Sequence, residues 1–149
     1  MPAYLAEMST RLGREVTESD LLDLASSDRL RRVVDDACDS TSRHTDAVGH
    51  EKTCSKRETE DRDEALRSLT AALASVDEVG PLWMMAMGSE TCGAVRVTLA
   101  ELVRQGLDLL GDDEDAVRIA SETGGSRIRL YADTVAGHAP RRWTICNCG

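Results

Sequence analysis

The feature that most constrains this fold is a long polar run in the first half of the chain. Residues 39–64 carry almost no apolar side chains, the exceptions being Ala47, Val48 and Cys54. Such a segment buries too little surface to offset the entropy lost on ordering. We therefore predict a helical segment at residues 1–38, a polar linker at 39–58, and an α+β domain with an exposed C-terminal tail at 59–149.

Before the linker, the apolar pattern predicts three short helices. The first covers residues 3–12 and ends at Gly13, the second begins near Thr17, and the third follows Ser27 as its N-cap. In the third, apolar residues recur at helical spacing, at Leu30, Val33, Val34 and Ala37.

After the linker, helices alternate with a buried strand. A helix is predicted over residues 60–79, because its apolar stripe ends at Gly80 and Pro81. Residues 82–87 form a short continuous apolar run, which is typical of a buried strand. Thr98 and Glu101 have the spacing of a capping box and predict the start of another helix.

The last third of the chain predicts a hairpin. Residues 117–120 and 127–130 alternate apolar with polar side chains on either side of Gly124 and Gly125. Residues 141–145 could add an edge strand. We therefore expect an α+β fold with helices packed on a small antiparallel sheet that contains a C-terminal hairpin.

Charge and composition narrow the classes of partner. This small acidic protein has 27 Asp and Glu against 18 Lys and Arg, a formal net charge of −9. A negative field repels phosphate backbones, so we expect a protein partner rather than nucleic acid. No run approaches the ~20 apolar residues that cross a bilayer, so we expect no membrane partner. The composition does not predict the oligomeric state.

The cysteine count and the residue bias predict a cellular compartment and a type of genome. Five cysteines is an odd number, and the N-terminus has no secretory pattern, which together predict reduced thiols in the cytoplasm. Arginine strongly outnumbers lysine and Phe is absent. That bias favours a GC-rich genome, such as that of an actinobacterium or one of its phages.

The polar segment contains a candidate zinc site. Cys38, His44, His50 and Cys54 supply two thiols and two imidazoles, a ligand set that suits a closed tetrahedral Zn²⁺ site. Metal binding would also explain how so polar a segment orders, since binding energy can supply folding energy. The alternative is two solvated histidines and two unrelated cysteines, because the spacing is wider than in most zinc motifs.

The C-terminus contains a second candidate site. Cys146 and Cys148 lie one residue apart beside Arg141 and Arg142, whose charge favours the thiolate form. The pair could be a redox or metal-binding dithiol. Residues 144–149 could instead be the modified core of a ribosomal peptide precursor, because Thr and Cys are the residues that such pathways modify. An ordinary exposed tail is the third interpretation.

A third candidate is Cys92, in a glycine-rich loop between a predicted strand and a predicted helix. A nucleophile there would need a base, and His138 is one candidate. The chain otherwise carries no nucleotide-binding, metalloprotease or hydrolase motif. We therefore expect a non-enzymatic cytoplasmic protein that interacts with or regulates another protein, with thiol or zinc chemistry and the peptide precursor as alternatives.

Overall fold

The computed structural model describes residues 1–39, 43–45, 51–76, 80–111, 116–135 and 138–149, of which 43–45, 51–53, 134–135 and 138–140 are described by their backbone alone. The helices are α1 (Pro2–Leu12), α2 (Leu24–Asp39), α3 (Arg62–Ala74), α4 (Ser89–Cys92) and α5 (Leu99–Gln105), with 3₁₀ turns η1 (Glu18–Asp20) and η2 (Gly106–Leu109). The strands are β1 (Arg43–Thr45), β2 (Glu51–Thr53), β3 (Ser55–Thr59), β4 (Leu82–Met85), β5 (Val95–Val97), β6 (Ala116–Ser121), β7 (Arg127–Val135) and β8 (His138–Asn147).

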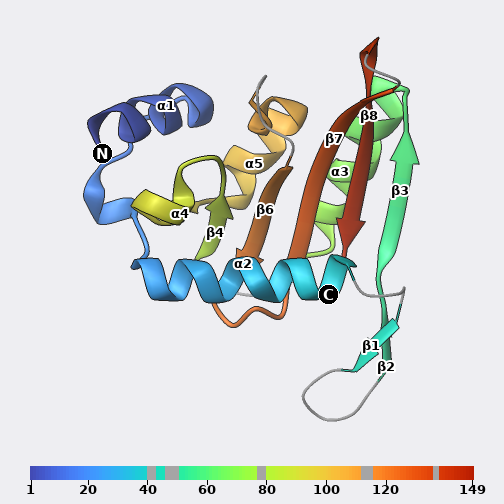
Figure 1. Cartoon of the computed structure of the whole chain (residues 1–149), viewed down its shortest axis with the longest axis horizontal. Helices are drawn as coiled ribbons and strands as arrows, with labels where there is room; N and C mark the ends of the chain where they lie inside the picture. Colours follow the sequence, from blue (N-terminus) through green and yellow to red (C-terminus); the bar gives the residue numbers. More distant parts are fainter. Residues whose placement is uncertain (40–42, 46–50, 77–79, 112–115, 136–137) are drawn as a thin grey trace.

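Six of these strands form one antiparallel sheet in the order β3-β8-β7-β6-β4-β5, and β1 pairs with β2 separately (Figure 1). The α+β prediction and its C-terminal hairpin are therefore confirmed. The hairpin joins β6 to β7 with Ile119 opposite Ile128, and the buried strand predicted after Pro81 is β4.

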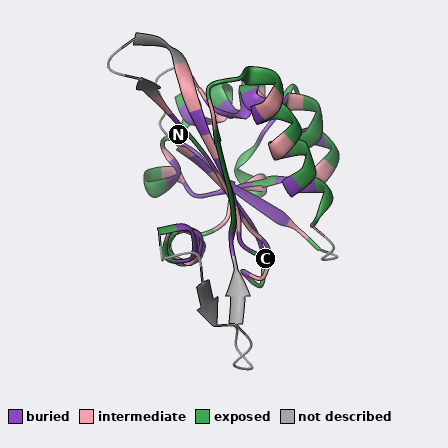
Figure 2. Cartoon of the chain, turned by 90° about the vertical axis from the view of Figure 1, so that its right-hand side faces the viewer, coloured by how far each residue is buried: buried purple, intermediate pink, exposed green. Residues whose placement is uncertain are grey.

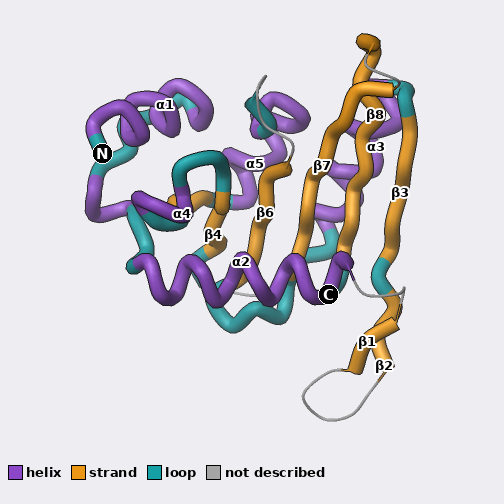
Figure 3. Tube along the Cα trace, in the orientation of Figure 1, coloured by secondary structure: helices purple, strands orange, loops and turns teal. Residues whose placement is uncertain are grey.

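Helices cover both faces of the sheet. One face packs against α2, which crosses the lower part of the strands in Figure 3 and is seen end-on beside the sheet in Figure 2. On the opposite face, a larger apolar cluster joins the sheet to helices α1, α3 and α5. Side chains along the strands alternate between these clusters, so Met84 and Ile145 belong to the larger cluster while Met85 and Cys146 belong to the cluster with α2.

The N-terminal helices differ in part from the prediction. Where a second helix is expected near Thr17, the structure has only the 3₁₀ turn η1. This turn begins with a capping box between Thr17 and Asp20. The chain then runs alongside β5, where the Leu22 N–H donates to the Ala94 carbonyl at 2.9 Å. This approach requires Gly93, because a Cβ there would lie 2.2 Å from the Leu22 carbonyl oxygen.

The polar linker and the N-terminal segment are tied to the sheet. Residues 55–58 of the expected linker belong to β3, an edge strand paired with β8. Its outward side chains need no apolar partner, which is why the pattern resembles a linker. Met8 and Leu12 of α1 are fully buried in the same cluster as Leu69 of α3, so the boundary at 39–58 does not separate two cores.

The C-terminal tail also differs from the prediction. Residues 141–145, expected at most as an edge strand, lie in β8, which is inside the sheet between β3 and β7. Trp143 and Ile145 are buried on the α3 face. The tail is therefore a packed strand rather than an exposed end.

Candidate thiol and metal centre

Four of the five cysteines meet at one edge of the α2 face. Cys38 is the penultimate residue of α2, Cys54 directly precedes β3, Cys146 lies near the end of β8, and Cys148 follows that strand. Figure 1 shows the end of α2, the start of β3 and the C-terminus close together. All four residues belong to the apolar cluster between α2 and the sheet.

Local structure explains why the cysteines point to this place. On α2, Leu30, Val34 and Cys38 repeat every four residues and form the buried stripe that faces the sheet. On β8, Cys146 lies opposite Lys56 of β3 and Arg129 of β7. Beyond the strand, the Cys148 N–H donates to the carbonyl of Arg127 at 2.8 Å, which holds this residue at the sheet edge.

The sulfur atoms are within contact distance. The Sγ of Cys148 lies 4.0 Å from that of Cys38 and 3.4 Å from that of Cys146. The three Sγ atoms all lie within 4.8 Å of one another. Cys148 is joined to Cys54 by a disulfide with Cα atoms 4.4 Å apart, so the fourth sulfur belongs to the same group. We call Cys38, Cys54, Cys146 and Cys148 the four-cysteine centre.

The two cysteines of the centre that lie outside the disulfide have opposite pKa shifts. A hydrogen bond to Cys146, together with burial, raises the pKa of the Cys38 thiol. The same hydrogen bond lowers the pKa of Cys146, against burial and with the help of the charges of Lys56 and Arg129. Of the two thiols, Cys146 is therefore the one that loses its proton more readily.

Ion pairs connect the centre to α2. Arg129 binds Asp39 at 2.7 Å and Asp35 at 3.1 Å, which joins β7 to the last turns of the helix. Arg118 of β6 also binds Asp35, at 2.6 Å. The hydrogen bond from Arg129 lowers the pKa of Asp39, so this carboxylate stays charged. These pairs hold the end of α2, and with it Cys38, against the sheet.

The centre is closed to solvent. The exposed fractions of Cys38, Cys54, Cys146 and Cys148 are 0%, 5%, 2% and 0%. Thiol–disulfide exchange with another protein needs an accessible sulfur. The burial is instead the environment of a structural disulfide or of a closed metal site.

The ligand set also fits a metal ion. Four thiolates are the ligands of a Cys₄ zinc site, in which a tetrahedron with Zn–S bonds of about 2.3 Å has sulfur atoms about 3.8 Å apart. The Sγ atom of Cys148 lies 4.0 Å from that of Cys38 and 3.4 Å from that of Cys146. One of these sulfur–sulfur distances is slightly longer and the other slightly shorter than in such a tetrahedron. In the structure Cys54 and Cys148 form a disulfide, so a Cys₄ site would require that bond to be reduced.

The structure brings together half of one predicted site and the whole of the other. Cys38 and Cys54 come from the predicted Cys38/His44/His50/Cys54 set, and Cys146 and Cys148 are the predicted terminal pair. The side chain of His44 and the whole of His50 lie outside the described residues. Residues 144–147 of the suggested precursor core lie within β8, so a modifying enzyme would have to act on a paired strand.

Sequence reasoning treated the two cysteine pairs as separate sites. Cys38 continues the buried stripe of α2, and Cys146 alternates with Ile145 along a strand, so both patterns place a thiol on a buried face. These patterns do not show that the two buried faces pack against each other. Cys92 of α4 is half-buried and outside the four-cysteine centre.

Comparisons with known proteins add no assignment. No family model matches the chain, and neither a curated protein nor a solved structure is significantly similar to it. In the described part of the chain, no helix is both long and apolar enough to cross a bilayer.

Proposed function

We propose that this is a zinc-binding protein in which Cys38, Cys54, Cys146 and Cys148 hold one Zn²⁺ ion. The observation that carries this proposal is the convergence of four buried sulfurs from three distant parts of the chain. The metal would join the end of α2, the start of β3 and the C-terminus. Zinc binding in such sites contributes directly to folding free energy.

The charges around the centre support this proposal. Four thiolates around one Zn²⁺ carry a net charge of about −2, which costs free energy to bury unless cations lie nearby. Lys56 and Arg129 both lower the pKa of Cys146, which places two positive charges close enough to favour thiolates. The thiolate is the form that binds metal.

A closed site also agrees with the non-enzymatic function expected from the sequence. Four protein ligands fill the tetrahedral zinc coordination and leave no position for water or substrate. The metal would therefore have a structural role, holding these three segments together. Binding of another protein, and with it a regulatory function, remains a prediction from the acidic composition.

Metal content tests the proposal. Protein purified under reducing conditions with added Zn²⁺ should contain about one zinc per chain by mass spectrometry of the native protein. Replacing Cys38 by Ser should lower the zinc content several-fold, because three thiolates and a hydroxyl make a weaker ligand set.

Cys92→Ser is the matched control, since Cys92 lies outside the centre. It should bind as much zinc as the unaltered protein. Equal zinc in both variants, or a metal-free reduced protein with four free thiols at the centre, would show that the cysteines do not form a zinc site.

A further inference from the structure

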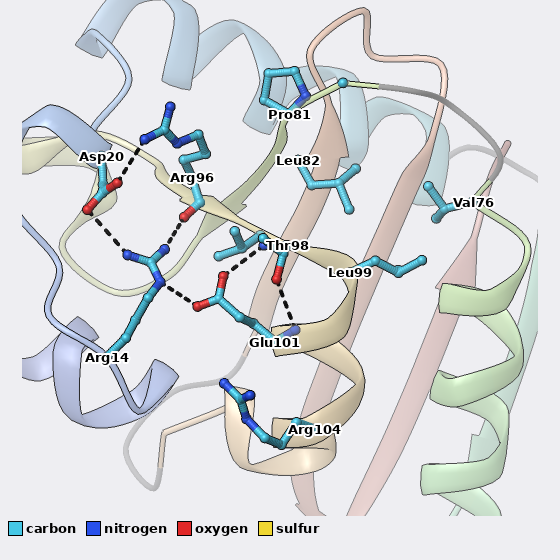
Figure 4. A pocket seen from close by; sticks show the side chains of 12 residues that line it. Arg14, Asp20, Val76, Pro81, Leu82, Arg96, Thr98, Leu99, Glu101 and Arg104 are labelled. Carbon is cyan, nitrogen blue, oxygen red and sulfur yellow. Dashed lines mark hydrogen bonds and ion pairs between the residues drawn. The ribbon is translucent and has the colours of Figure 1, made fainter.

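A second feature, far from the cysteines in the fold, is a cavity of about 690 Å³ beside the edge strand β5. It lies where the loop after α1 approaches β5 and the start of α5, and none of its lining residues belongs to the four-cysteine centre. Figure 4 shows charged side chains at one end of this cavity and apolar side chains at the other. The volume is in the range of small-molecule sites.

Arg14 is fixed at the charged end. Its Nε donates to the Glu101 carboxylate, and its terminal nitrogens donate to Asp20 at 3.3 Å and to the Arg96 carbonyl at 2.6 Å (Figure 4). Most of its donors are therefore used within the protein. Arg14 shapes the wall of the cavity and positions its neighbours.

The two carboxylates at this end, Glu101 and Asp20, are also held in ion pairs and hydrogen bonds within the protein. Burial works to raise the pKa of Glu101, but Arg14 and the Thr98 N–H outweigh it, so the pKa lies below its usual value. A hydrogen bond from the Thr17 N–H, together with Arg96 and Arg14, lowers the pKa of Asp20. Both groups therefore stay ionised near neutral pH.

The remaining two arginines have donors to spare. Arg96 donates to Asp20 at 3.1 Å, and Arg104 donates to the Leu12 carbonyl at 3.4 Å. The described contacts use one terminal nitrogen of each. Since a guanidinium carries five N–H donors in a planar fork, both side chains can still bind an anion through paired hydrogen bonds.

The other end of the cavity accepts hydrocarbon. Its apolar lining is Val76, Pro81, Leu82, Val97 and Leu99. Leu82 and Val97 lie opposite each other on β4 and β5 and are nearly fully buried, at 5% and 3% exposed. A hydrocarbon chain placed against them would leave water without removing the arginines from solvent contact.

We propose that this cavity binds a small organic monoanion, a carboxylate with an apolar body. The carboxylate would lie at Arg96, and the hydrocarbon against Leu82, Val97 and Leu99 (Figure 4). Three arginines against two carboxylates leave the cavity one positive charge. That balance suits a single negative charge, whereas a nucleotide or another polyanion would be repelled by Asp20, Glu101 and the acidic chain.

The test uses octanoate as the probe, titrated into the full-length protein by calorimetry. Octanoate should bind saturably, and Arg96→Gln should weaken its binding about tenfold or more, the effect of losing a charged hydrogen bond. Arg67→Gln is the matched control, since Arg67 is an exposed arginine on α3 that lines a different cavity. It makes the same change in net charge and should leave the affinity within about twofold.

Two further ligands test the chemical class. Octanol, which has the same chain without the charge, and ATP, a polyanion, should both bind at least about tenfold more weakly than octanoate. The proposal is overturned if octanoate shows no saturation by about 10 mM. It is also overturned if octanol or ATP binds equally well, or if Arg96→Gln binds octanoate like Arg67→Gln. Unchanged thermal melting of each variant verifies its fold.

Discussion

At the scale of single residues, Glu101 illustrates how local and long-range contacts share one side chain. Its carboxylate accepts from the Thr98 N–H at 2.9 Å, which completes the capping box of α5. The same carboxylate binds Arg14, which follows α1 in the chain. The capping box can be predicted from the spacing of Thr98 and Glu101, whereas the ion pair depends on how α1 packs beside α5.

Replacing Glu101 by Gln should destabilise the fold by about 1–3 kcal/mol at pH 7, because Arg14 then loses its buried carboxylate partner. The pKa of Glu101 is below its ordinary value of 4.5. The stability from its charge is therefore fully present above that pH and is lost as the pH falls through the lowered pKa. Urea unfolding of both proteins should show a difference that is constant from neutral pH to about pH 5 and shrinks below it.

Asp108→Asn is the control for that experiment. Asp108 pairs with Arg62 at 3.4 Å, but both side chains are mostly exposed, so the change should cost less than about 0.5 kcal/mol. A difference at Glu101 as small as that at Asp108, or one that grows as the pH falls, would contradict the role given to the buried pair.

At the scale of elements, the pattern of apolar residues predicts most helices and strands but not their neighbours. α3, β4 and the β6–β7 hairpin follow directly from stripes, an apolar run and a glycine turn. β3 escapes prediction because Ser55–Thr59 has exposed polar side chains and is held by backbone pairing with β8. That pairing joins residues almost ninety positions apart, so no local pattern contains it.

The four-cysteine centre escapes prediction for the same reason. Cys38 and Cys148 are separated by 110 residues, yet their sulfurs are 4.0 Å apart. Only the packing of α2 on the sheet and the place of β8 inside it bring them together. Each cysteine can be recognised as a ligand type from the sequence, but the set of four depends on the topology.

Zinc removal should loosen particular elements rather than the whole fold. The end of α2 and β3 should exchange amide hydrogens about tenfold or more faster in reduced, zinc-free protein than in zinc-loaded protein, because their tie to the C-terminus is lost. α1 and α5 should exchange at the same rate in both, since they pack in the cluster on the opposite face. Hydrogen exchange with mass spectrometry gives both rates, and equal acceleration of all helices would contradict this assignment.

At the scale of the whole molecule, the centre brings together three segments at one edge of the sheet, namely the end of α2, the start of β3 and the C-terminus. The proposed zinc-bound state would differ from the disulfide state by two electrons and one metal ion. Hydrogen peroxide would oxidise the thiolates of Cys54 and Cys148 in such a site to a disulfide, peroxide and two protons would become two waters, and Zn²⁺ would lose two of its four ligands.

Peroxide treatment of the zinc-loaded protein should therefore release about one Zn²⁺ per chain, measured with a chromogenic zinc indicator. Peptide mapping of the product should find the Cys54–Cys148 disulfide. Release should be slow relative to that from an exposed thiolate site, because the four sulfurs are at most 5% exposed. Formation of the disulfide with the metal retained would contradict the shared use of these sulfurs.

The most direct test of the account is X-ray absorption at the zinc edge of the reduced, zinc-loaded protein. The four-cysteine centre predicts a first shell of four sulfur atoms at about 2.3 Å. A shell of two sulfurs and two nitrogens at about 2.0–2.1 Å would instead assign the metal to Cys38, His44, His50 and Cys54. That result would contradict the site derived from the packing of α2 against β8.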